Sequence, residues 1–230
     1  MFADYPVLQY IFCIVMGYAF GMFSSGYLIG KIYNVDLRTQ GSGNLGTTNV
    51  LRVIGLKAGI ITLVIDLSKT FIPLFLTRYL LFKQYAPFSD ENQLLFLYTA
   101  LGCVAGHLFP FYLKFRGGKG IACMGACMLI YDWRLPAVAF PIFLGIILIT
   151  RYMSVASLVA SVIFPIFVGI VTKGNIHMIV VTSLFTISAF YNHRQNIVRL
   201  IHGNENKITI KKNGPDKTPE KDTNKTEDRK

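Results

Sequence analysis

Long apolar runs separated by short polar segments organise most of this chain. Residues 6–30 form the first run and contain no charged side chain, and six more follow at about 58–82, 93–113, 119–132, 136–150, 154–172 and 176–192. A helix needs roughly 20 apolar residues to cross about 30 Å of hydrocarbon. The pattern therefore predicts an all-α, polytopic integral membrane protein with about seven transmembrane helices. The runs at 119–132 and 136–150 are short, so their limits are the least defined.

The positions of lysine and arginine predict how these helices are oriented. Most of these residues lie in alternate polar segments, namely 31–57, 113–119, the junction at Arg151 and the segment after residue 192. The intervening segments carry one basic residue each and hold the acidic residues Asp90, Glu91 and Asp132. Because basic segments stay in the cytoplasm, an odd number of spans places the N-terminus outside and the C-terminus in the cytoplasm.

Composition supports an integral membrane protein and limits the kinds of partner that the chain can bind. Of the 230 residues 53% are hydrophobic and 15% are charged, with a mean hydropathy of +0.47, whereas soluble domains average about 25% charged residues. A net charge of +11 suits nucleic acid, an anionic membrane surface or anionic substrates, and the apolar runs favour the last two. The four cysteines lie in apolar runs without other ligands, which indicates buried thiols and no metal site.

The end of the chain differs from the rest. From Gly203 onward it reads GNENKITIKKNGPDKTPEKDTNKTEDRK, which mixes both signs of charge and has almost no large apolar residues. Such a segment cannot bury enough surface to order itself. The sequence therefore predicts one transmembrane domain over residues 1–202 and a disordered, charged cytoplasmic tail over residues 203–230.

The segment GSGNLGTTNVLR, residues 41–52, matches the G-x-G-x-x-G pattern of dinucleotide-binding folds. That pattern requires a preceding strand and a βαβ unit, and membrane-length runs stand on both sides here, so this interpretation is excluded. Glycines let several backbone amides face one anionic oxygen. The segment adds polar and cationic side chains that suit the same purpose: Ser42, Asn44, Asn49 and Arg52. A flexible polar loop is the alternative that spacing alone leaves open.

A second polar segment, GHLFPFYLKFRGGKGIA, covers residues 106–122 and does not fit the Walker A pattern. Gly117 and Gly118 give a permissive backbone before Lys119, where the next apolar run begins. A lysine beside a helix N-terminus suits a phosphate group. The alternative is that these basic residues only set topology and that His107 is an interfacial or core histidine.

Further polar groups lie at or within the spans. Asp66 and Lys69 share one face of the second run, where charged residues require a partner or a cavity, so an ion pair and a functional role both remain open. Ser157 belongs to a serine series that also suits close helix packing. The segment NHRQN places His193 and Asn196 after the last run. The chain contains no H-x-x-x-x-D motif, so acyltransferases that use this His–Asp dyad are excluded. It also contains no G-x-S-x-G motif.

Together these three segments resemble, in order and separation, the signatures of the bacterial membrane acyltransferases that transfer a fatty acyl group from acyl phosphate to glycerol 3-phosphate. The resemblance extends to about residue 208. It implies a seven-span protein of the bacterial inner membrane, with its active site facing the cytoplasm. It also implies glycerol 3-phosphate and acyl phosphate as substrates, contact with membrane lipid, 1-acyl-glycerol 3-phosphate and phosphate as products, and no cofactor.

The resemblance also implies roles for particular residues. The expected catalytic residues are Ser42, Arg52, Lys119 and His193. The expected substrate-binding residues are Gly41, Gly43, Asn44, Asn49, His107, Gly117, Gly118, Ser157 and Asn196. Either His193 or a substrate phosphate oxygen accepts the proton. Asn192 and Gln195 depart from the Arg and Glu usual in the family. A transporter or flippase for an organic phosphate or phospholipid is the alternative, although it would place broken helices near the midplane.

Overall fold

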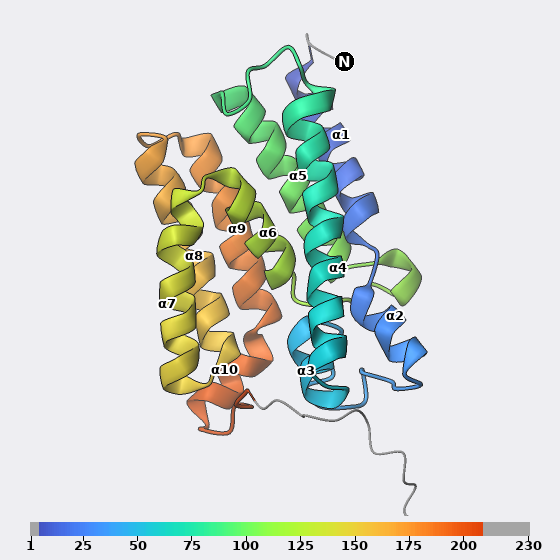
Figure 1. Cartoon of the computed structure of the whole chain (residues 1–230). Helices are drawn as coiled ribbons and strands as arrows, with labels where there is room; N and C mark the ends of the chain where they lie inside the picture. The colour runs from blue at the N-terminus through green and yellow to red at the C-terminus, as the bar shows by residue number, and fades with distance from the viewer. Residues whose placement is uncertain (1–4, 209–230) are drawn as a thin grey trace, which may run out of the picture.

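The computed structural model describes residues 5–208, and it is all-helical, with no β-strand among these residues (Figure 1). Its elements are α1 (Pro6–Gly21), α2 (Ser25–Ile32), α3 (Thr47–Val53), α4 (Leu56–Phe75), the π-helix η1 (Leu76–Leu81), α5 (Asp90–Leu108), the 3-10 helix η2 (Phe111–Leu113), α6 (Ile121–Tyr131), α7 (Arg134–Thr150), α8 (Met153–Val171), α9 (Ile176–Asn192) and α10 (Arg194–Ile201). The all-α part of the predicted fold class is confirmed.

An apolar helix lies at each of the seven predicted runs. Within the described residues, four segments are long and apolar enough to cross a membrane: Pro6–Ile32, Leu56–Leu81, Asp90–Leu113 and Met153–Val171. Three apolar helices are shorter, namely Ile121–Tyr131, Arg134–Thr150 and Ile176–Asn192. The count of seven spans and the outward N-terminus therefore stay predictions.

The first apolar run is long and apolar enough as a whole to cross a membrane, over Pro6–Ile32, but it is divided into two helices. α1 ends at Gly21 and α2 begins at Ser25. The hydroxyl of Tyr112 accepts a hydrogen bond from the Ser24 amide at 3.0 Å and donates one to the Met22 carbonyl at 2.9 Å. Irregular backbone is tolerated in such a bundle where neighbouring groups satisfy it. Sequence reasoning counted only charges in this run and overlooked its pair of serines.

α1 and α5 pack with their backbones in direct contact. A Cβ added to Gly17 would lie 2.1 Å from the Thr99 carbonyl oxygen, and one added to Gly106 would lie 2.3 Å from the Tyr18 carbonyl oxygen. Gly21 and Gly102 stand in the same relation to the opposite helix. Both helices thus carry a G-x-x-x-G pair, which allows the close helix approach seen in membranes.

The short helix α6 lies between two groups of helices. It contacts α4 and α5 on one side and α7 and α8 on the other (Figure 1). Its buried residues include Met128 and Tyr131, which belong to the main apolar core together with Phe164 of α8 and Phe185 of α9. The core therefore joins both groups of helices through α6.

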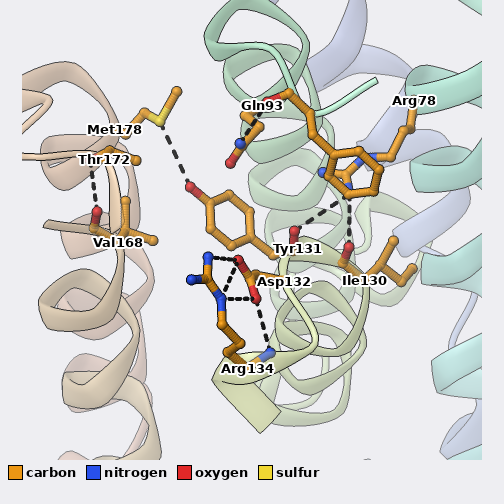
Figure 2. A network of polar contacts seen from close by, with 10 residues as sticks. Arg78, Gln93, Ile130, Tyr131, Asp132, Arg134, Val168, Thr172 and Met178 are labelled. Carbon is orange, nitrogen blue, oxygen red and sulfur yellow. Dashed lines mark hydrogen bonds and ion pairs between the residues drawn. The ribbon is translucent and has the colours of Figure 1, made fainter. Parts of the chain in front are cut away.

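Several polar contacts hold the C-terminal end of α6 (Figure 2). The guanidinium of Arg78 donates to the Ile130 carbonyl at 2.8 Å and stacks between the rings of Phe88 and Phe96, at 4.2 and 4.1 Å from their centroids. The hydroxyl of Tyr131 donates to the Met178 sulfur at 3.7 Å. These contacts fix α6 and, through it, the polar segment that precedes it.

The chain packs back against the helices after α10. The amide of Ile208 donates to the Arg151 carbonyl at 2.9 Å, and Glu205 is 8% exposed. The sequence assigned these residues to the tail because their composition is polar, and the start of that segment is instead held by contacts. The predicted disordered tail from residue 209 onward lies outside the described residues.

Candidate active site

A cavity of about 690 Å³ is lined by residues of several helices. They include residues of α3 and α10, which lie at the same end of the bundle (Figure 1). Its lining includes every predicted site residue that is not a glycine: Ser42, Asn44, Asn49, Arg52, His107, Lys119, Ser157, His193 and Asn196. The four predicted glycines, Gly41, Gly43, Gly117 and Gly118, are not part of the lining. Segments far apart in the sequence thus meet around one space.

The cavity has a polar part and an apolar part. The polar part is formed by the segment around Ser42 and Arg52, the segment around Lys119, and the region after α9. The apolar part lies between α4, α6, α7 and α8 and is lined by Leu63, Leu67, Met124, Met128, Leu129, Pro136, Ala139, Phe140, Phe143 and Ala160. A ligand with an anionic head and a hydrocarbon chain matches this division.

Two cations face the polar part. The ammonium of Lys119 donates a hydrogen bond to the side-chain oxygen of Asn196. Burial lowers the pKa of Lys119 to about 8; Glu205 opposes the shift, while Arg199 and Arg52 add to it by repulsion. Burial likewise lowers the pKa of Arg52, which has no ion-pair partner among residues 5–208. The positive charges of Lys119 and Arg52 are only partly balanced by nearby groups and are partly shielded from water. They therefore attract an anion strongly.

Glu205 organises this corner, although sequence reasoning missed it. One of its carboxylate oxygens accepts from Ser154 at 2.9 Å and from Asn196 at 2.6 Å, and the other accepts from Arg199 at 2.8 Å. Burial alone would raise the pKa of Glu205, but these hydrogen bonds outweigh it and the pKa is lowered. Because Glu205 binds the Asn196 amide nitrogen, the Asn196 oxygen faces Lys119. In the sequence, the one feature that pointed to Glu205 is that it is an isolated acidic residue beside a basic segment.

His193 is nearly buried, at 3% exposure, and its Nδ1 lies 2.8 Å from the Ala189 carbonyl oxygen. A carbonyl can only accept, so this contact assigns the proton to Nδ1 and leaves Nε2 as a hydrogen-bond acceptor. Burial and repulsion by Lys119 lower the pKa of His193 to about 4. The ring is therefore neutral at pH 7 and is a weak base.

Asn49 shapes the first segment. Its amide nitrogen donates to the carbonyls of Leu37 and Gln40 at 3.2 and 3.1 Å, and its oxygen accepts from the Ser42 amide at 2.8 Å. Gly41 has a φ of +61°, and a Cβ there would lie 2.3 Å from the Asn49 oxygen. The amide of Asn49 and the bare backbone of Gly41 thus fix the position of Ser42 in the cavity wall.

The glycines of the second segment serve close packing. The amides of Gly117 and Gly118 donate to the carbonyls of Leu108 and His107, each at 3.0 Å. A Cβ on Gly118 would lie 2.0 Å from Nε2 of His107. The segment therefore folds directly onto the end of α5, which places Lys119 beside the buried histidine.

A buried polar cluster lies beneath this contact. Asp66 and Lys69 form an ion pair at 2.8 Å, which confirms one of the two interpretations that the sequence left open. The Lys69 ammonium also contacts His107 Nδ1 at 2.8 Å and donates to the Phe23 carbonyl at 2.6 Å, and the Ser25 hydroxyl donates to Asp66 Oδ1 at 2.8 Å. The cluster joins the break between α1 and α2 to the cavity.

The sequence matches a known family over most of its length. The family model described as glycerol-3-phosphate acyltransferase matches residues 11–203. The chain belongs to the glycerol-3-phosphate acyltransferase family. A family relative from Clostridioides difficile (strain 630) is 39% identical over 208 residues, which cover 90% of this chain and 98% of the relative. One from Staphylococcus aureus (strain Newman) is 34% identical over 204 residues, which cover 87% and 98%.

Two solved structures in this family are also similar. PlsY, described as an integral membrane glycerol 3-phosphate acyltransferase, in its glycerol 3-phosphate form has a TM-score of 0.76 and 32% identity, covering 87% of this chain and 96% of that one. Its lysophosphatidic acid form has a TM-score of 0.73 and 31% identity, covering 86% and 94%. The family is thus one of integral membrane acyltransferases, and this membership favours the acyltransferase prediction over a transporter.

Proposed function

We propose that this protein transfers a fatty acyl group from acyl phosphate to the 1-hydroxyl of glycerol 3-phosphate, and so supports phospholipid synthesis. The observation that carries the proposal is the single cavity that joins the cationic pair Arg52 and Lys119 to a long apolar part. The glycerol 3-phosphate and lysophosphatidic acid forms of PlsY support the choice of acceptor and product.

Charge explains the need for two cations. Both substrates carry phosphate, so they repel each other when they approach within reacting distance. Arg52 offers a planar guanidinium that binds two phosphate oxygens at once, and Lys119 offers a compact charge. Placed in one desolvated corner, they hold both anions and stabilise the charge that grows on the leaving phosphate.

The reaction needs no covalent enzyme intermediate. The hydroxyl oxygen of glycerol 3-phosphate bonds to the carbonyl carbon, the bond from that carbon to the phosphate oxygen breaks, and inorganic phosphate leaves. The Nε2 atom of His193 orients the attacking hydroxyl by accepting its hydrogen bond. Because a ring with a pKa of about 4 is a weak base, a phosphate oxygen is the better final acceptor for the proton.

The remaining roles follow from position. The acyl chain occupies the apolar part between α4 and α7, and Ser42, Asn44, Ser157 and Asn196 bind the phosphate and glycerol groups. The basic segments around the cavity support an active site on the cytoplasmic side of the inner membrane, with seven spans and the N-terminus outside.

The test is an assay with detergent-purified protein, acyl phosphate and labelled glycerol 3-phosphate. The expected result is formation of 1-acyl-glycerol 3-phosphate and inorganic phosphate in equal amounts, with acyl-CoA inactive as the donor. Efficient turnover of acyl-CoA would contradict the donor assignment. Binding of both substrates without any product would favour the transporter alternative.

A further inference from the structure

Asp66 is a buried carboxylate with only one of its oxygens in use. The residue is 1% exposed, and its Oδ1 lies 2.8 Å from the Ser25 hydroxyl, 2.8 Å from the Lys69 ammonium and 3.6 Å from His107 Nδ1. Its Oδ2 is buried and has no hydrogen-bond partner among the described residues. A buried acceptor without a donor is unfavourable and is uncommon in folded proteins.

The neighbouring donors are already engaged. The Lys69 ammonium contacts the Phe23 carbonyl, Asp66 Oδ1 and His107 Nδ1, and the Ser25 hydroxyl is bound to Oδ1. No donor of this cluster therefore serves Oδ2. Asp66 itself lines the cavity that holds Arg52 and Lys119, so a ligand in the cavity is the available source of a hydrogen bond.

The position of Asp66 defines which part of a ligand it meets. On the same helix, Leu63 and Leu67 line the apolar part of the cavity. Asp66 also contacts His107, against which Gly118 packs, one residue before Lys119. Asp66 thus lies where the cationic corner meets the apolar part, and the uncharged middle of the acceptor substrate has to occupy this boundary.

We propose that Oδ2 of Asp66 accepts a hydrogen bond from the 2-hydroxyl of glycerol 3-phosphate, an inference that rests on the proposed function. The 1-hydroxyl has to face the acyl carbonyl and His193, which comes from the α9–α10 junction, whereas Asp66 comes from α4. The ion pair with Lys69 keeps the carboxylate charged, so it binds the hydroxyl and is a poor base. Asp66 then selects phosphates that carry a hydroxyl next to the reacting one.

The experiment compares two acceptors, glycerol 3-phosphate and 3-hydroxypropyl phosphate, which lacks the 2-hydroxyl. The wild-type protein should prefer glycerol 3-phosphate in kcat/KM by about tenfold or more, the usual effect of one hydrogen bond to a charged group. In Asp66→Asn an NH2 group replaces the acceptor, and the preference should fall below about threefold because the loss falls on glycerol 3-phosphate.

Ser25→Ala is the matched control, since it removes a donor to Oδ1 and leaves Oδ2 unchanged. It should keep the wild-type preference. Equal activity of the wild-type protein on both acceptors, or an equal loss on both in Asp66→Asn, would overturn the assignment. Calorimetric binding of the two phosphates to the wild-type protein makes the same comparison without turnover, so failure of the proposed chemistry is distinguishable from failure of this contact.

Discussion

Raising the pH should remove the charge of Lys119 within the range in which acyl transfer can be assayed. Burial lowers the pKa of its ammonium from the ordinary value of 10.5 to about 8, with Glu205 opposing the shift and Arg52 among the groups that add to it. Arg52 stays charged throughout this range, as guanidinium groups do in proteins. The loss of one cation should therefore appear as an alkaline limb that belongs to Lys119 alone.

The size of the limb follows from the pKa. At about 8, roughly 90% of Lys119 is charged at pH 7 and about 10% at pH 9. The kcat/KM for glycerol 3-phosphate should fall about tenfold for each pH unit above that value, because the phosphate binds the charged form. The second phosphate pKa is about 6, so the substrate keeps its charge above pH 7. Bound phosphate stabilises the ammonium, so kcat at saturation should stay level to a higher pH.

The assay measures kcat/KM and kcat from pH 7 to 9.5 at constant ionic strength, with spontaneous hydrolysis of acyl phosphate subtracted at each pH. Lys119→Arg provides the control, since its guanidinium does not titrate here, and it should move the alkaline limb out of range even if its activity at pH 7 is lower. A level wild-type profile up to pH 9.5, or an unchanged limb in Lys119→Arg, would refute the assignment.

Three further changes test other parts of the site. Arg52→Ala should lower kcat/KM by about 100-fold or more while the protein still folds in the membrane, because a buried charge-assisted contact to phosphate is lost; turnover near wild type would remove Arg52 from the site. His193→Ala should lower kcat about tenfold, as expected for one hydrogen bond, and a loss beyond about 10³-fold would instead indicate proton transfer by the ring. Gly118→Ala should destabilise the protein by about 1–3 kcal/mol, because the added Cβ clashes with His107. Thermal unfolding in detergent measures this loss. Gly145→Ala is the control: Gly145 has open space around it, so this variant should unfold as the wild-type protein does.

The periodicity of apolar runs predicted where helices occur because a bilayer imposes one simple rule on length and polarity. The three polar segments that the sequence analysis placed together do meet in the structure, because residues from around Ser42, Lys119 and His193 line one cavity. Such grouping depends only on counting spans between segments. It does not require knowledge of how any side chain packs.

Tertiary contacts determine the features of the structure that the sequence did not predict. The break after Gly21 depends on the hydroxyl of Tyr112, which lies 90 positions further along than its partner Met22. Likewise, Asn49 was expected to bind substrate, but its side chain binds backbone carbonyls. Glu205 was assigned to the tail, but it orients Asn196. Residue type shows which hydrogen bonds are possible, and only the fold determines which partner is nearest.

The direct backbone contact between α1 and α5 also has a mechanical consequence. Carbonyl oxygens of the opposite helix lie directly against Gly17 and Gly106, so at these positions no side chain separates the two backbones. We expect such close contact to make the two helices move together. His107 lies at the end of α5, and Gly118 packs against it. This side of the cavity is therefore formed by closely packed residues. We therefore expect this side of the cavity to keep its position when a ligand enters or leaves.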